Sequence, residues 1–238
     1  MLNLNKISKS IKDKIIVNDI SFEINEGSIN GLLGPNGAGK TTTFYLIAGL
    51  IPLDSGEIIY NNQNISNLPM HKRSNIGIKY LPQEPSIFQN LTVRENLYGL
   101  AEISLREKNK IDKFMDQSIE EFSLQDVLNQ KGRQLSGGQR RKVEIARTLA
   151  ASPKIILLDE PFAGIDPIAI DDIKNVLKGL KNKGIAILIT DHNVRETLTL
   201  IDRAVLIHEG SVLIEGEPSD IVGNEDVRKV YLGDRFSI

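Results

Sequence analysis

The sequence has no cysteine, no tryptophan and no marked excess of either charge, since its formal net charge is −2 over 238 residues. The lack of cysteine excludes disulfide bonds and cysteine-ligated metal sites, and it suits a reducing compartment. The near balance of charge gives no electrostatic case for nucleic acid as a partner. No apolar run approaches the length that crosses a bilayer, and the first residues lack the apolar core of a signal peptide. We therefore expect a soluble chain with one large core.

The strongest motif is a glycine-rich segment between a predicted strand and a predicted helix. It consists of Gly34, Pro35, Asn36, Gly37, Ala38, Gly39, Lys40, Thr41 and Thr42. This pattern, G-x-x-x-x-G-K-[ST], is that of a phosphate-binding loop when a strand precedes it and a helix follows, as residues 28–33 and 41–50 predict here. Backbone N–H groups and the helix dipole would then bind phosphate oxygens. Lys40 would reach the β- and γ-phosphates of ATP, and the Thr41 hydroxyl would bind Mg²⁺.

Two acidic residues follow a second apolar run. Residues 155–158 are all isoleucine or leucine and predict a strand that is buried on both faces of a parallel sheet. Asp159 and Glu160 come next, at the carboxyl end of that strand, where open α/β sheets bind their ligands. By itself such a pair is usually a solvated strand end. Together with a phosphate-binding loop, Asp159 is predicted to hold Mg²⁺, directly or through water, and Glu160 to deprotonate the attacking water.

A histidine follows a third apolar run. Residues 185–190 predict another buried parallel strand, and Asp191 and His192 come directly after it. A single histidine in this position is more often a surface or packing residue. Because the carboxyl ends of parallel strands lie at one edge of a sheet, we expect His192 to lie near Asp159 and Glu160.

A serine and two glycines precede a charged helical stretch. The segment Leu135-Ser136-Gly137-Gly138-Gln139 leads into residues 140–150, whose apolar positions have near-helical spacing. At the start of a helix, a serine hydroxyl and bare N–H groups can bind an anion. The chain therefore carries two half-sites for one nucleotide.

In this order the motifs resemble those of the ATP-binding cassette (ABC) family over essentially the whole chain. Leu135–Gln139 resembles the family's signature motif, Gln83 in Tyr80-Leu81-Pro82-Gln83 its Q-loop, Gly164-Ile165-Asp166 its D-loop, and His192 its switch histidine. The resemblance implies an α/β P-loop NTPase fold with a RecA-like core, an antiparallel β-subdomain and an α-helical subdomain. It implies one domain over residues 1–238, with the core and β-subdomain in 1–89 and 149–238 and the helical subdomain in 90–148.

The resemblance also implies roles and a partner. Gln83 would reach Mg²⁺ or the attacking water, and His192 would position the water and the γ-phosphate. In the family, the signature motif of one chain meets the phosphate-binding loop of another, which implies a homodimer with two composite ATP sites. Each chain would contribute to its partner's nucleotide through Ser136, Gly137, Gly138, Gln139 and Asp166.

Longer runs narrow the resemblance. The segments 161–164 (Pro-Phe-Ala-Gly) and 191–197 (Asp-His-Asn-Val-Arg-Glu-Thr) resemble those of the ATPase subunits of lipopolysaccharide exporters. This implies membrane-spanning partner subunits, a peripheral position on the cytoplasmic face of the inner membrane, and no direct contact with the transported molecule. Two alternatives stay open: the ATPase of a branched-chain amino-acid or other small-solute importer, and a soluble ABC protein without membrane partners.

The segment after Gln83 has two interpretations. Ile87, Phe88, Leu91 and Val93 either line a groove that receives short helices of the membrane subunits or belong to the core of the helical subdomain.

One position departs from the family pattern. ABC proteins usually stack adenine on an aromatic residue near the start of the domain, and the aligned residue here is Ile11. An isoleucine can cover the ring by apolar contact, but it lacks the aromatic stacking contribution of about 1 kcal/mol.

Overall fold

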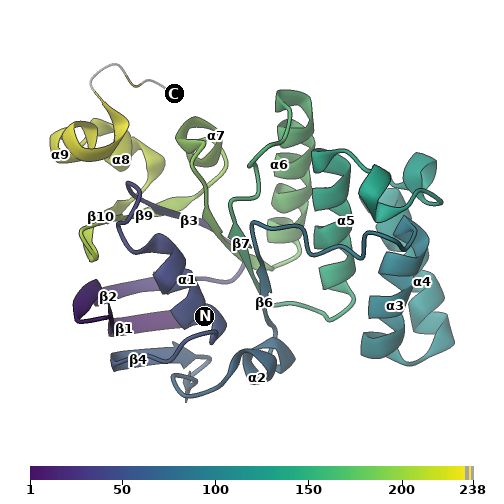
Figure 1. Cartoon of the computed structure of the whole chain (residues 1–238), viewed down its shortest axis with the longest axis horizontal. Helices are drawn as coiled ribbons and strands as arrows, with labels where there is room; N and C mark the ends of the chain where they lie inside the picture. The colour runs from purple at the N-terminus through teal and green to yellow at the C-terminus, as the bar shows by residue number, and fades with distance from the viewer. Residues whose placement is uncertain (234–235, 237–238) are drawn as a thin grey trace.

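A six-stranded, mostly parallel sheet runs through the centre of the computed structural model, which describes residues 1–233 and 236 (Figure 1). Its strands are β3 (Ile29–Leu33), β6 (Ile78–Leu81), β7 (Ile155–Asp159), β8 (Ala186–Thr190), β9 (Arg203–His208) and β10 (Ser211–Gly216), in the spatial order β10-β9-β3-β8-β7-β6. Only β10 is antiparallel to its neighbour. Every residue of β3, β7 and β8 is buried, which explains their continuous apolar runs.

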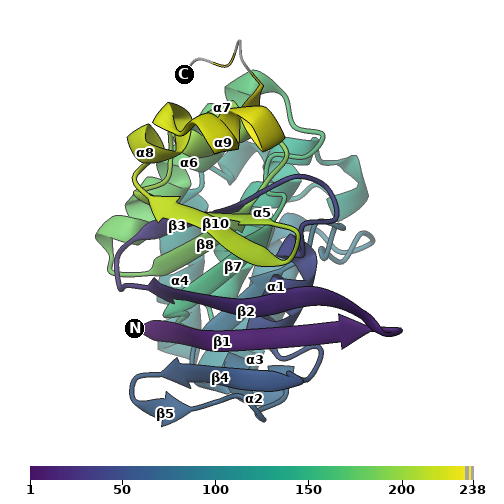
Figure 2. The same cartoon turned by 90° about the vertical axis from the view of Figure 1, so that its left-hand side faces the viewer.

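A second, antiparallel sheet contains the N-terminal strands. Figure 2 shows its members one below the other in the order β2 (Lys14–Ile24), β1 (Leu2–Ile11), β4 (Ser55–Tyr60) and β5 (Gln63–Asn64). Lys12 and Asp13 join β1 to β2 with positive φ angles of 49° and 64°, the backbone that a two-residue hairpin turn requires. One face of this sheet is apolar and packs on α1 (Lys40–Ala48).

Most helices lie along the parallel sheet or beyond its β6 edge. In Figure 1, α3 (Val93–Leu105), α4 (Lys108–Glu121) and α5 (Gly137–Leu149) lie on the side away from the antiparallel sheet. Two short 3₁₀ turns, η1 (Gln125–Val127) and η2 (Gly132–Gln134), connect α4 to α5. The remaining helical elements are α2 (Met70–Asn75), α6 (Pro167–Asn182), α7 (Val194–Leu198), α8 (Pro218–Gly223), α9 (Glu225–Val227) and the π turn η3 (Arg228–Leu232).

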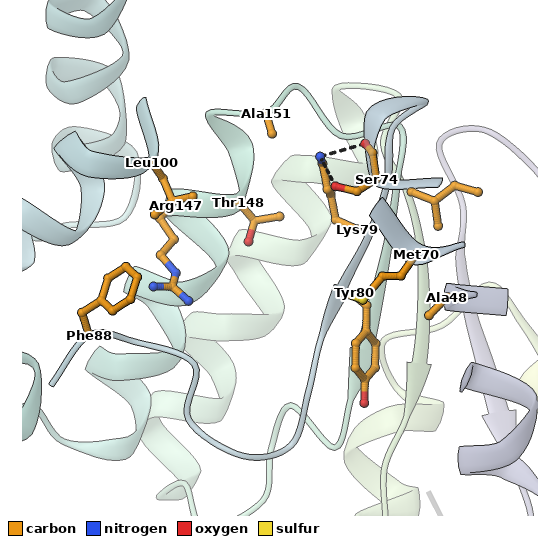
Figure 3. A pocket seen from close by; sticks show the side chains of 11 residues that line it. Ala48, Met70, Ser74, Lys79, Tyr80, Phe88, Leu100, Arg147, Thr148 and Ala151 are labelled. Carbon is orange, nitrogen blue, oxygen red and sulfur yellow. Dashed lines mark hydrogen bonds between the residues drawn. The ribbon is translucent and has the colours of Figure 1, made fainter. Parts of the chain in front are cut away.

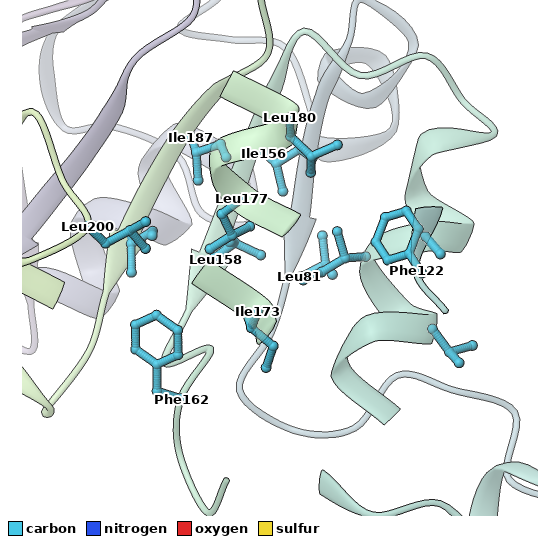
Figure 4. Close-up of a cluster of buried hydrophobic side chains, with 14 of the residues drawn as sticks. Leu81, Phe122, Ile156, Leu158, Phe162, Ile173, Leu177, Leu180, Ile187 and Leu200 are labelled. Carbon is cyan, nitrogen blue, oxygen red and sulfur yellow. The ribbon is translucent and has the colours of Figure 1, made fainter. Parts of the chain in front are cut away.

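The two faces of the parallel sheet belong to two hydrophobic clusters. On one face, Ile173 and Leu177 of α6 lie against Ile156 and Leu158 of β7 (Figure 4). Leu157 points the other way, into the cluster that includes α1 and the antiparallel sheet. This alternation along β7 follows from the two-residue repeat of a strand, and it fixes the sheet between α6 and α1.

The predicted fold class is confirmed: an α/β core is combined with an antiparallel sheet and a helical region. The division of the domain at residues 89/90 and 148/149 stays a prediction, and residues 234, 235, 237 and 238 of the predicted domain lie outside the described residues. Among the helices of residues 1–233 and 236, none has both the length and the apolar character that crossing a bilayer requires.

A buried arginine joins α2 to the end of α1. Arg73 is only 1% exposed, and its guanidinium donates hydrogen bonds to the carbonyl oxygens of Leu46 (2.6 Å), Ile47 (2.8 Å), Ser66 (2.8 Å) and Leu68 (2.7 Å). The carbonyls of Leu46 and Ile47 belong to the last turn of α1, where a positive charge is favourable. Burial lowers the pKa of Arg73 to about 10.

We expect Arg73→Met to lower the free energy of unfolding by about 3 kcal/mol, because two buried and two partly buried carbonyl groups lose a charged donor. Urea denaturation measures this change. The matched control is Arg203→Met, since the Arg203 side chain is half exposed and pairs with Glu215 at the surface. Equal losses of unfolding free energy in the two variants would contradict the stabilising role of the buried Arg73 hydrogen bonds.

Candidate nucleotide-binding and catalytic site

The glycine-rich loop after β3 fits only glycine at two points. Gly34 and Gly39 have φ angles of 147° and 106°. A Cβ atom on Gly34 would lie 2.1 Å from the carbonyl oxygen of Ile207, and one on Gly39 would lie 2.6 Å from that of Ile16. The loop is therefore held between the end of β9 and strand β2, and side chains there would push it away from both.

The first turn of α1 faces into this loop. The helix starts at Lys40 directly after Gly39, and within the described residues the N-cap position offers no side-chain hydrogen bond to its first N–H groups. The Lys40 Nζ donates hydrogen bonds to the carbonyl oxygens of Gly34 (2.6 Å) and Pro35 (3.0 Å), so the amine lies inside the curve of the loop. Burial lowers the pKa of Lys40, and the nearby carboxylates of Glu160 and Asp159 oppose that shift. Uncapped N–H groups and a buried amine together can bind phosphate.

The end of β7 carries two carboxylates with different surroundings. Asp159 is buried, and its Oδ2 accepts a hydrogen bond from the hydroxyl of Tyr80 (3.1 Å). Burial raises the pKa of Asp159, against the lowering effects of Tyr80, Arg141 and Lys40. Glu160 has a φ of 45°, an uncommon left-handed backbone for a residue with a side chain. Its N–H bonds the carbonyl of Thr190 (2.7 Å) at the end of β8.

Glu160 is the point where three distant segments meet. One carboxylate oxygen accepts a hydrogen bond from the Gln83 Nε2 (2.7 Å), and the other lies 2.6 Å from the His192 Nε2. A carboxylate in contact with an amide and an imidazole can orient and deprotonate a water molecule. The structure thus places His192 beside Glu160, as the strand ends predicted, and it also brings Gln83 to Glu160.

A cavity of about 470 Å³ opens beside these residues. It is lined by Thr41 from α1, Gln83 from the loop after β6, Asp159 at the end of β7 and Glu160 directly after that strand. Tyr80 lines it as well, and its ring packs edge-on against Tyr45 with the centroids 6.2 Å apart. Hydroxyl, amide and carboxylate oxygens that converge on one cavity form a donor set that suits Mg²⁺ bound to phosphates.

The signature segment lies elsewhere. Ser136 caps α5: its Oγ accepts from the Gln139 N–H (3.2 Å), and the Gln139 side chain accepts from the Ser136 N–H (3.0 Å). Within residues 1–233 and 236, the lining of the 470 Å³ cavity includes no residue of 135–139. The start of α5 packs closely on the start of α6, since a Cβ atom on Gly138 would lie 2.4 Å from the Cβ atom of Ala169. Asp166 caps that helix by accepting from the Ala169 N–H (3.0 Å).

Ile11 lies at the end of β1 and is 45% exposed. It precedes the hairpin turn, and β2 on the other side of that turn contacts the glycine-rich loop through the carbonyl of Ile16 beside Gly39. An exposed aliphatic side chain on this hairpin is available to a ligand near the loop.

One residue that supports the site escaped the motif search. Asp191 is buried between the loops that follow β7 and β8, and its carboxylate accepts from the N–H groups of Phe162 (2.8 Å) and Asn193 (2.7 Å). Burial raises the pKa of Asp191, while these hydrogen bonds oppose the rise. By joining the two loops, Asp191 fixes the segments that carry Glu160 and His192. The sequence carries two signals for it: its position directly after a buried strand and its place at the start of the run 191–197.

Comparison with known proteins agrees with the motifs. Residues 17–163 match the ABC transporter family. The lipopolysaccharide export system ATP-binding protein LptB of Haemophilus influenzae is 50% identical over 240 residues, which cover 100% of this chain and 99% of that protein. A nucleotide-free ATP-binding cassette from an ABC transporter superposes with a TM-score of 0.88 at 30% identity, over 98% of this chain and 99% of that one. A dimeric cassette in a post-hydrolysis state, bound to ADP and Pi, gives a TM-score of 0.79 at 26% identity, over 92% and 99% of the two chains.

Proposed function

Because the chain belongs to the ABC transporter family and is an ATPase, we propose that its hydrolysis of ATP powers the export of lipopolysaccharide from the inner membrane to the outer membrane. One observation carries this choice of substrate. The similarity to the LptB of Haemophilus influenzae extends at 50% identity over the entire chain, well beyond the catalytic motifs. A small-solute importer would share the catalytic residues but has no comparable observation in its favour here.

We propose that residues 34–42 hold the triphosphate of ATP, with Lys40 at the β- and γ-phosphates and Ile11 over the adenine. Thr41, Gln83 and Asp159 would hold Mg²⁺, which offsets the charge of the phosphates when it is bound. Glu160 takes a proton from the attacking water, and His192 positions that water and the γ-phosphate. The hydrogen bond from Gln83 to Glu160 and the contact between Glu160 and His192 support these roles.

The active form in this proposal is a homodimer with two composite sites. In the described part of the chain, the lining of the cavity at Glu160 includes none of five predicted nucleotide contacts, which are Ser136, Gly137, Gly138, Gln139 and Asp166. This supports a second chain as the place where these five residues contact nucleotide. The similarity to a dimeric cassette supports it as well. A head-to-tail arrangement would bring each signature segment to the partner's phosphate-binding loop.

We expect Glu160→Gln to bind ATP and to dimerise, yet to lower kcat at least about 100-fold, because an amide cannot accept the proton from water. Steady-state hydrolysis and equilibrium nucleotide binding measure the two effects separately. The control is Glu120→Gln, which makes the same change on the exposed face of α4. Near-normal turnover in Glu160→Gln would contradict its role as the base.

A cavity of about 270 Å³ beside β6 and α5 is the proposed docking site for the membrane subunits. Phe88 is 54% exposed at its rim, and the Arg147 guanidinium lies 5.5 Å from the centroid of its ring (Figure 3). Within the described part of the chain, the buried Nη1 of Arg147 has no hydrogen-bond partner. An apolar helix would fill the cavity and pack against the exposed ring of Phe88.

The segment after Gln83 is interpreted either as a groove for membrane-subunit helices or as core of the helical subdomain, and each interpretation fits different residues. Ile87 and Val93 are 5% and 0% exposed and belong to the core, so they do not line a groove. Leu91 is exposed, but it lines another cavity together with Tyr98. Phe88 alone of the four lines the cavity near Arg147.

We propose that the occupants of this cavity are helices of LptF and LptG, to which LptC is attached. The chain would then be a peripheral subunit on the cytoplasmic face of the inner membrane. Transported lipid would pass through the membrane subunits without touching this chain, and nucleic acid would have no part in the cycle.

Affinity capture of the intact chain from native membranes tests the proposal. We expect two polytopic subunits and lipopolysaccharide in the captured complex, and about tenfold less of them with Phe88→Ala, because the exposed ring lines the docking cavity. Leu91→Ala is the control, since Leu91 lines the other cavity. Capture of a solute permease would favour an importer, and unchanged capture with Phe88→Ala would contradict the docking site.

A further inference from the structure

A glutamate is buried in the signature helix, where pattern alone predicts a solvated charge. Glu144 lies on α5, two turns after Ser136, and is 2% exposed. Its Oε1 accepts hydrogen bonds from the backbone N–H groups of Ser86 (2.6 Å) and Ile87 (3.2 Å). Both residues follow Gln83 on the loop after β6. A carboxylate is stable in such a place only if donors satisfy it, so these contacts are the condition for its burial.

Two arginines on the same side of α5 bind the rest of that loop. Arg141 pairs with Glu144 (3.2 Å), and it donates to the carbonyl oxygens of Pro82 (3.0 Å) and Asp159 (3.2 Å). Arg147 donates to the carbonyl oxygen (2.6 Å) and hydroxyl (2.8 Å) of Ser86. The three positions are spaced by three residues, which places them along one stripe of the helix. Both ends of the segment 82–87, which we call the Gln83 loop, are thus bound to α5.

We propose that Glu144 is a positioning residue: it holds the Gln83 loop on the signature helix, so that Gln83 at Glu160 and Ser136 at the start of α5 move as one body. This inference rests on the proposed roles of Gln83 and Ser136. It adds a connection between the two half-sites of one chain: a movement that carries Ser136 toward a partner's nucleotide also moves Gln83 relative to Glu160. Such a link makes hydrolysis depend on dimer closure through a rigid contact.

The competing explanation is that Glu144 only neutralises the buried Arg141. The two explanations differ in what the side chain must provide. Holding the loop requires length, because the Oε1 spans from the helix to the N–H groups of Ser86 and Ile87. Neutralising Arg141 requires charge. Glu144→Asp keeps the charge and shortens the side chain, whereas Glu144→Gln keeps the length and an acceptor oxygen but loses the charge.

Amide hydrogen exchange and steady-state kinetics on the intact chain distinguish the explanations. In Glu144→Asp we expect the N–H groups of Ser86 and Ile87 to exchange about tenfold faster. The kcat should fall about three- to tenfold with the KM for ATP nearly constant, because Gln83 is displaced while the phosphate-binding loop is intact. Glu144→Gln should lie closer to the unmodified chain in both measurements. Asp172→Asn is the control, since it removes a charge that pairs with α5 through Lys142, away from the Gln83 loop.

A double variant tests whether Glu144 acts through Gln83. Combining Glu144→Asp with Gln83→Ala should lower kcat no further than Gln83→Ala alone. The inference would be overturned if the losses of kcat from Glu144→Asp and Gln83→Ala multiplied in the double variant. It would also be overturned if Glu144→Asp kept a higher kcat than Glu144→Gln. A normal rate in Gln83→Ala by itself would reject the proposed role of Gln83, and the exchange of Ser86 and Ile87 would still decide whether Glu144 holds the loop.

Discussion

The contacts of Glu160 with Gln83 and His192 exist because three parallel strands end at the same edge of one sheet. Strand β7 lies between β6 and β8, with Leu81 opposite Leu158 and Asp159 opposite Thr190. Each strand is followed within two residues by one of the three side chains. A shift of register in either ladder would separate them, and the burial of β7 and β8 between two hydrophobic clusters prevents such a shift.

Helix α5 connects this edge to the rest of the molecule. Its first residue follows Ser136, its middle binds the Gln83 loop and the carbonyl of Asp159, and its last turn lies beside Phe88 at the proposed docking cavity. One helix therefore touches three places. They are the proposed docking cavity, the Gln83 loop that contacts Glu160, and the Ser136 segment that is proposed to contact a second chain's nucleotide. In the middle of the helix, Glu144 and Arg141 are charged groups bonded to backbone, which favours transmission of a rigid displacement over local adjustment.

Sequence was sufficient for the parts of the site that obey local patterns. Apolar runs that end in polar residues located Asp159, Glu160 and His192, and the glycine pattern located the loop before α1. The supporting charges could not be found in this way. Arg73, Arg141 and Glu144 are buried because backbone groups far along the chain satisfy them, and no local pattern records those partners. Ile87 and Val93 belong to the core for the same reason, since the packing of α3 and α5 around them is a tertiary property.

Each ATP site in the proposed dimer needs residues of two chains, and mixing two inactive variants tests this requirement. Lys40→Ala lacks the amine that is proposed to bind phosphate. Ser136→Asp keeps a good helix cap but places a negative charge at the proposed phosphate contact. A mixed dimer has one site with both defects and one with neither. For an equal mixture, random pairing and independent sites, the account predicts about a quarter of the normal ATPase rate per chain. A mixture no faster than the two variants measured apart would contradict it.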